Sequence, residues 1–256
     1  MANKYFNINF IFMLIFIFSV AHAQIPDSFT NLTALPKDIG KKDLIGIMKN
    51  FTSSLGVRCN YCHAGKEGIS DPQELSEIDF ASDKIPAKDI TRVMMKMTQS
   101  INNDHLTLIK EKNHLEKVEC VTCHKGMAEP PKKLENILAR QYEKSGIEAA
   151  LKKYDELRAK YYGAYVYDFT FQPLSNFSDA LINENKGEDL VNFFTAFLNK
   201  YDKNSWNAYL EIGKAYASEN KFDEAKMNYD KALEISPNNE NVMWFYDKLN
   251  KEIKKK

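Results

Sequence analysis

The feature that most constrains this chain is a five-residue motif, Cys-x-x-Cys-His, which occurs twice. It forms residues 59–63 and 120–124, and the two copies contain all four cysteines of the sequence. Two cysteines three positions apart lie on one side of a helical turn, so both can form thioether bonds to one porphyrin, and the histidine then ligates its iron. The sequence therefore predicts two covalently bound haem c groups. The residues that would bind them are Cys59, Cys62 and His63 in the first motif and Cys120, Cys123 and His124 in the second.

Two other uses of paired cysteines remain open. Each pair could form a disulfide bond in an exported chain, although a thioredoxin-like redox motif needs a strand–helix–strand context and only helical patterns surround Cys59. The two pairs could instead bind one zinc ion. However, residues 63–119 separate them, whereas a zinc ribbon separates its pairs by about 15–20 residues, and both histidines would be surplus ligands.

The N-terminal residues have the pattern of an export signal. Lys4 precedes an apolar run over residues 10–20, which ends at the small-x-small sequence Ala21-His22-Ala23. We expect a signal peptide over residues 1–23 that is cleaved near Ala23, which makes the mature chain periplasmic. An uncleaved membrane anchor is the alternative. Lys+Arg 35 equals Asp+Glu 35, so the overall charge does not indicate a nucleic-acid partner.

A haem held by one histidine has a second axial position, and a helix before each motif carries methionines that could fill it. In the first helix Met48 lies within an apolar stripe, and Gly56 is a plausible end of the helix. In the second, which can start at Pro86, the stripe contains both Met94 and Met97, while Met95 points away from it. Spacing does not choose between Met94 and Met97, and a methionine on such a stripe is more often a core residue. The stripes are Leu44, Ile47, Met48, Phe51 and Leu55, and Ile90, Val93, Met94, Met97 and Ile101.

Residues 31–131 resemble the cytochrome c subunit of the photosynthetic reaction centre. The likeness rests on "LPKDIGKKDLIGIMKNFTSSLGVRCNYCH" and on "RVMMKMTQSIN", followed by "VECVTCHKGMAEPP". In that family the helix before each motif supplies an axial methionine, so the resemblance implies Met48 and Met94 as iron ligands and Met97 as a packing neighbour. The family subunit carries four haems and is usually lipid-anchored. This chain has two motifs and no lipidation cysteine, so it resembles half of that subunit. His105 and His114 are the less favoured alternative ligands.

The sequence after the second motif has a different organisation. "GMAEPPKKLEN", residues 126–136, interrupts the helical pattern, and residues 205–239 then follow the tetratricopeptide pattern, with small residues at Gly213 and Ala225 where two helices approach closely. An earlier copy places Leu190, Phe194 and Phe197 opposite Ala225, Tyr229 and Ala232. A looser copy spans residues 134–162, and Trp244, Phe245 and Leu249 would form a capping helix. A generic helical bundle is the alternative.

These patterns predict an all-α protein with a signal peptide (1–23), a diheme cytochrome c domain (24–130) and a tetratricopeptide-like repeat domain (131–256). We expect it to transfer electrons between redox partners, either other redox proteins or a membrane electron-transfer complex, and to bind a peptide or protein through its repeats. Electron transfer is favoured over enzyme activity. Two alternatives remain: a diheme peroxidase-type enzyme, in which Met48 or Met94 does not bind iron, and a haem-based sensor or scaffold, whose partner affinity would depend on oxidation state.

Overall fold

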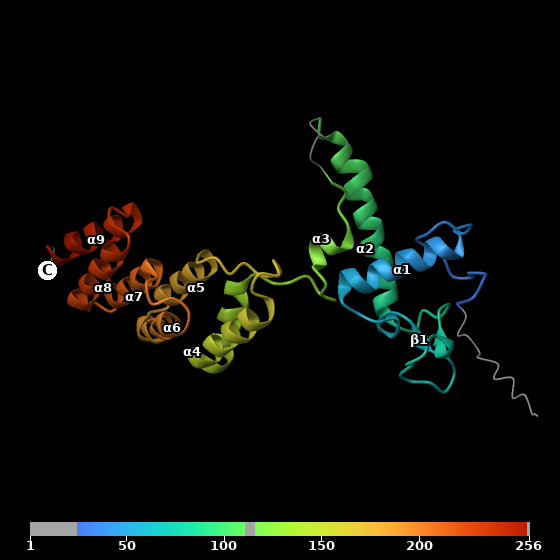
Figure 1. Cartoon of the computed structure of the whole chain (residues 1–256), viewed down its shortest axis with the longest axis horizontal. Helices are drawn as coiled ribbons and strands as arrows, with labels where there is room; N and C mark the ends of the chain where they lie inside the picture. The colour runs from blue at the N-terminus through green and yellow to red at the C-terminus, as the bar shows by residue number, and fades with distance from the viewer. Residues whose placement is uncertain (1–24, 111–115, 255–256) are drawn as a thin grey trace, which may run out of the picture. The chain divides into compact units, whose positions relative to one another are not determined.

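The computed structural model of the chain describes residues 25–110 and 116–254. The predicted signal peptide and His114 lie outside these residues. The chain divides into two compact units, residues 1–122 and 123–256. The domain boundary at residue 130 therefore stays a prediction. The described residues form helices and two very short strands, which confirms the all-α class (Figure 1). None of the described helices combines the length and apolar character needed to cross a bilayer.

The N-terminal unit is built around two helices, α1 (Lys41–Leu55) and α2 (Pro86–Ser100). Gly56 ends α1 in the left-handed conformation with φ 64°, as expected for a helix terminator, and Pro86 begins α2, where its missing N–H costs nothing. The shorter elements between and after them are η1 (Cys59–Tyr61), β1 (Ala64–Gly65), η2 (Leu75–Glu77), β2 (Ile78–Asp79), the π-helical η3 (Ile101–His105), η4 (Leu106–Leu108) and α3 (Cys120–His124). The two strands, which the sequence analysis did not predict, pair antiparallel.

The C-terminal unit contains a series of helices that pack on their neighbours along the chain, most extensively α6 on α7 and α7 on α8 (Figure 1). The first of them kinks at Gly146, where φ is 79°, and therefore consists of two helices, as the looser repeat copy requires. These helices are α4 (Leu134–Tyr161), α5 (Gln172–Asn183), α6 (Gly187–Lys200), α7 (Trp206–Ser218), α8 (Phe222–Ile235) and α9 (Glu240–Ile253).

Burial in this unit follows the predicted repeat alignment. The residues aligned in the two copies are all buried: Leu190, Phe194 and Phe197, and Ala225, Tyr229 and Ala232. A Cβ atom at Gly213 would overlap the ring of Tyr229, so the absence of a side chain on α7 is what lets α8 pack closely against it. In the capping helix α9, Leu249 is buried, whereas Trp244 is 59% exposed. The packing thus supports the repeat interpretation over a generic bundle.

Candidate functional site

The first motif forms a tight turn that holds its three chemical groups together. The backbone N–H groups of Cys62 and His63 both donate to the carbonyl of Cys59, at 3.3 Å and 3.1 Å. Directly after the motif, β1 pairs with β2, with Ala64 opposite Asp79. The hydrogen-bonded turn and the strand pair therefore fix the backbone on both sides of His63.

A cavity of about 470 Å³ lies beside this turn, within the range of roughly 300–1,000 Å³ that small-molecule and cofactor sites occupy. Its lining is mostly apolar and comes from the N-terminal segment, α1, the first motif, β2 and α2. The structure brings four predicted site residues together here: Met48, Cys59, Cys62 and His63 all line the cavity. Met95 also lines it, on the side of α2 opposite the predicted stripe, so the cavity contains two thioether side chains.

The imidazole of His63 is half-buried in its neutral form. Burial, and secondarily the positive charge of Lys88, lower the pKa of His63 to about 4, so the ring is neutral at physiological pH, as metal ligation requires. Its Nδ1 atom is buried and has no hydrogen-bond partner among the described residues. The ring of Phe80 contacts the imidazole edge-on, with centroids 5.2 Å apart. A neutral imidazole with an unpaired nitrogen in an apolar cavity next to two free thiols fits covalently attached haem.

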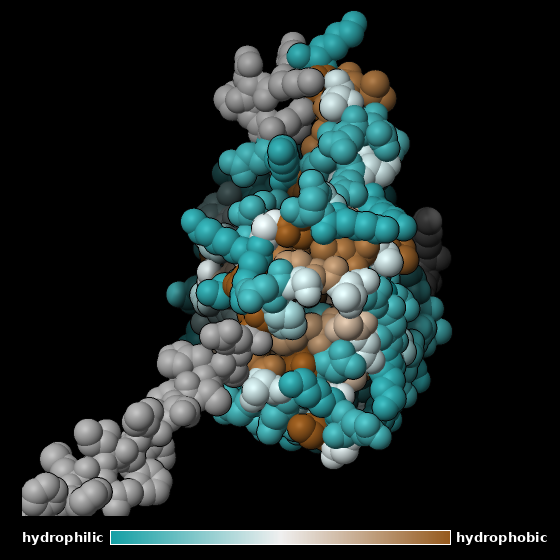
Figure 2. Space-filling model, turned by 90° about the vertical axis from the view of Figure 1, so that its right-hand side faces the viewer, coloured by the Kyte–Doolittle hydropathy of each residue, from teal (hydrophilic) through white to brown (hydrophobic). Residues whose placement is uncertain are grey.

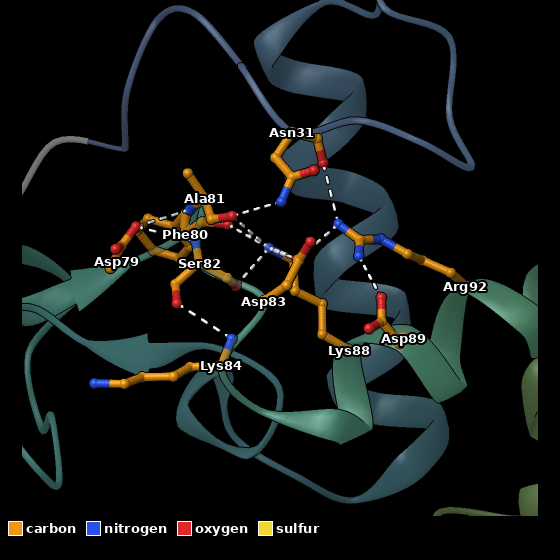
Figure 3. Close-up of polar contacts among 10 residues, drawn as sticks. All are labelled: Asn31, Asp79, Phe80, Ala81, Ser82, Asp83, Lys84, Lys88, Asp89 and Arg92. Atoms are coloured by element: carbon orange, nitrogen blue, oxygen red, sulfur yellow. Dashed lines mark hydrogen bonds and ion pairs between the residues drawn. The ribbon is translucent and has the colours of Figure 1, made fainter.

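A polar network centred on Lys88 and Arg92 joins α2 to the N-terminal segment and to the loop that follows β2 (Figure 3), and both side chains also line the cavity. The ammonium of Lys88 donates to the carbonyls of residues 80, 81 and 82 at 2.8–3.2 Å and lies 3.0 Å from the carboxylate of Asp83. One turn further along α2, Arg92 pairs with the same carboxylate at 2.9 Å and donates to the carbonyl of Asn31 at 3.3 Å. The two cations hold the pKa of Asp83 well below its usual range, chiefly through hydrogen bonds from Arg92. They join the N-terminal segment and the loop that carries Phe80 to α2.

The entry to the second motif is fixed to the end of the helix that precedes it. The side chain of Asn102 forms two hydrogen bonds with the backbone of Val118, donating to its carbonyl and accepting from its N–H, each at 2.8 Å. Val118 precedes Cys120, the first residue of the helical turn α3, by two positions. His105, at the end of η3, is exposed.

The imidazole of His124 is oriented by residues that follow it. Its Nδ1 atom lies 2.9 Å from the carbonyl oxygen of Met127, a hydrogen bond that leaves Nε2 as the nitrogen free for iron. The hydroxyl of Tyr167 donates to the sulfur of Met127 at 4.0 Å, and the ammonium of Lys125 donates to the carbonyl of Tyr165 at 3.1 Å. The aromatic segment 161–171 therefore packs against the loop that orients His124, a role that the sequence did not reveal.

The predicted apolar stripe of α2 is not covered by the described residues. Ile90 and Val93 are 58% and 61% exposed, and Met94 and Met97 are 39% and 48% exposed. Hydrophobic surface also lies open at the centre of the face that Figure 2 draws, where hydrophilic side chains surround it. An apolar helix face that carries two methionines suits a large planar apolar group. Both methionines are exposed, so the choice between Met94 and Met97 stays open.

The structure gives no support to the two other uses of the cysteines. No disulfide bond joins any of the four cysteines, all of which lie within the described residues. Within residues 25–110 and 116–254, no group of three His, Cys, Asp or Glu side chains comes together that could hold a metal ion. Haem ligation by one histidine and one methionine needs no such group.

Comparisons with known families assign two parts of the chain. Residues 71–177 match the family described as photosynthetic reaction centre cytochrome C subunit, and residues 206–239 match the tetratricopeptide repeat. No curated protein matches the chain. The cytochrome match includes the second motif and Met94 and extends to α5, whereas the first motif and Met48 precede it. The likeness found in the sequence covered residues 31–131, so the match begins and ends later along the chain.

Family models therefore match both resemblances that the sequence motifs indicated, each over part of the chain. The cytochrome family implies covalently bound haem c and haem-based electron transfer, and the tetratricopeptide repeat implies interaction with a protein partner. The chain thus combines a segment similar to the photosynthetic reaction centre cytochrome c subunit with a tetratricopeptide repeat.

Proposed function

We propose that this chain is an exported diheme c-type cytochrome that transfers electrons between protein redox partners. The observation that carries the proposal is the first cavity, where both cysteines of one motif, its histidine and a methionine from α1 line the same apolar space. Neither of the two other uses considered, a disulfide bond or a zinc site, needs a cavity of that size beside the cysteines.

In the first site, Cys59 and Cys62 would hold the porphyrin, and His63 and Met48 would occupy the two axial positions. Bound haem supplies a reversible one-electron couple, whose potential a methionine ligand raises. The chain's own contribution is to keep His63 neutral, to hold Phe80 against its edge and to exclude water with an apolar lining. If both side chains ligate the iron, no position would stay open on it, which favours electron transfer over chemistry on a small molecule.

For the second site, we propose Cys120 and Cys123 as attachment points, with His124 and Met94 as ligands. Two observations support it: the carbonyl of Met127 fixes the orientation of the His124 ring, and the methionine-bearing face of α2 is open. The resemblance favours Met94 over Met97.

We further propose that the chain acts in the periplasm after cleavage near Ala23, because haem attachment of this type takes place outside the cytoplasm. The repeat helices of the C-terminal unit would bind a peptide or protein partner, as helical repeat arrays do. Such a partner would be another redox protein or a membrane electron-transfer complex.

The number of haems is tested by the mass of the denatured, exported protein together with a pyridine haemochrome assay. We expect two covalently bound haems in the unmodified chain. The double variants Cys59→Ser with Cys62→Ser and Cys120→Ser with Cys123→Ser should each retain one. Bare polypeptide mass, with the colour extracted into acidified solvent, would contradict covalent attachment altogether.

The axial ligands are tested by the weak long-wavelength absorption band of methionine-ligated ferric haem. Met48→Ala should remove the contribution of the first site, whereas Met95→Ala, the matched control on the same cavity, should not. Met94→Ala and Met97→Ala form the corresponding pair for the second site. If Met48→Ala leaves the band unchanged, the ligand assignment is wrong. An open iron site with peroxide turnover in the unmodified protein would favour the peroxidase alternative.

A further inference from the structure

The outer face of α1 has a shallow depression, which we call the lysine notch. It is lined by Lys41, Lys42, Ile45, Gly46 and Lys49. The space next to Gly46 is open, because a Cβ atom built there would meet no heavy atom within 4 Å. The notch is therefore an opening in the helix surface that a side chain from another molecule can enter.

The lysine notch shares a wall with the first cavity. Ile45 and Lys49 line both, and Met48, from the same turn of α1, lines the cavity. A group seated in the notch is thus separated from the interior of the cavity by side chains of a single helix. Among the described residues, this is a place where a second protein can come close to the predicted haem without entering the cavity.

The rim of the lysine notch is positively charged and largely unpaired. Lys42 and Lys49 are exposed, and within the described part of the chain neither side-chain ammonium has an ion-pair or hydrogen-bond partner. Lys41 pairs with Asp27 at 2.6 Å. The nearby carboxylate of Asp43 lies over the start of the helix, where a Cβ at Gly40 would be 3.6 Å from its Oδ2. Since the whole chain has as many acidic as basic residues, this excess is local.

We propose that the lysine notch is the docking surface for the redox partner of the first haem, and that this partner presents carboxylates around a protruding apolar side chain. The lysines attract and orient the acidic surface, and the apolar side chain occupies the space above Gly46. The inference rests on the proposed electron-transfer function, because it assigns the route by which electrons reach the first site.

The test measures the rate at which reduced flavodoxin, an acidic redox protein, reduces the mature haem-loaded protein in a stopped-flow instrument. The charge variant carries Lys42→Glu and Lys49→Glu, and the matched control carries the same charge change at exposed positions of the repeat unit, Lys152→Glu and Lys226→Glu. Rates are compared at about 0.01 M and about 1 M ionic strength, where the Debye length is about 30 Å and about 3 Å. A third variant, Gly46→Leu, fills the notch without changing charge and has room to do so.

We expect the charge variant to react at least about tenfold more slowly at low ionic strength and at the unmodified rate at high ionic strength, with the control pair close to unmodified. Gly46→Leu should slow the reaction severalfold at both ionic strengths. An equal loss in the control pair, an unchanged rate in the charge variant, or an unchanged rate in Gly46→Leu each overturns the proposal. Absence of a haem spectrum before mixing would instead refute the proposed function, so the two failures are distinct.

Discussion

Replacing Gly213 by alanine tests whether close packing of α7 on α8 holds the repeat unit together. A Cβ at this position would lie 3.1 Å from Cζ of Tyr229 and closer still to Cδ1 and Cε1 of the same ring. Tyr229 is 1% exposed and packs within the cluster formed by α7, α8 and α9, so its ring cannot move into solvent. The two helices must separate, or the ring must leave its position in the core.

The magnitude follows from two opposing effects. Overpacking a well-packed core typically costs about 1–3 kcal/mol, and overlap with three atoms of a fixed ring places this site at the upper end. Alanine in place of glycine inside a helix stabilises the folded state by up to about 1 kcal/mol. We therefore expect Gly213→Ala to lower the free energy of unfolding by about 2 kcal/mol.

Urea denaturation of the mature protein provides the measurement. Both tryptophans of the chain, Trp206 and Trp244, lie in this unit, so their fluorescence reports its unfolding. Gly46→Ala, followed by circular dichroism, is the matched control: it also places alanine inside a helix, but in open space, and should stabilise by up to about 1 kcal/mol.

A second substitution separates steric overlap from other causes. Tyr229→Leu removes the ring, so the double variant with Gly213→Ala should be more stable than the sum of the two single effects predicts. If Gly213→Ala is as stable as the unmodified protein, or if the two effects simply add, the argument that this glycine is required for helix approach is refuted.

Three further predictions concern single side chains. Lys88→Leu removes the hydrogen bonds to three backbone carbonyls and should destabilise the N-terminal unit by about 2 kcal/mol in urea denaturation; an unchanged midpoint would contradict this. Gly126→Ala strains a backbone position with φ 78° and should disturb the hydrogen bond of His124, raising the reduction potential of the proposed second haem in spectroelectrochemical titration; an unchanged potential would exclude this coupling. Burial raises the pKa of Glu211 above 4.5, so the free energy of unfolding of the protein should fall as the pH rises from 4.5 through that raised value. Glutamine does not ionise, so Glu211→Gln should become more stable relative to the unmodified protein across this range. A stability difference that does not depend on pH would argue against this.

Much of the fold follows from patterns that are local in the sequence. Gly56 ends α1 and Pro86 begins α2, as the termination and initiation signals predicted. The alignment of repeat copies identified residues such as Phe194 and Tyr229, which are buried in the structure. Helix ends and periodic burial can be predicted because they depend on residues only a few positions apart.

The cavity was predictable only in part. The sequence indicated Met48, Cys59, Cys62 and His63 as one site, and these residues do line one cavity. It gave no reason to place Met95 there, because Met95 lies off the apolar stripe of its helix, and the stripe was the face expected to offer a haem ligand. In the structure the stripe is open, and the side of α2 that carries Met95 faces the cavity. The apolar stripe was correctly identified, but the surface it faces depends on what packs beside the helix.

The sequence by itself determined the two cysteine–histidine motifs, the helical elements and the repeat pattern, because each is encoded within one helical turn or one repeat. Only the tertiary structure decided which side chains surround the motifs. Asn102 binds Val118, Lys88 holds the loop that carries Phe80, and segment 161–171 packs against the loop after His124. These contacts join segments that are distant along the chain, and their formation depends on how whole elements pack, which neither periodicity nor motif spacing contains.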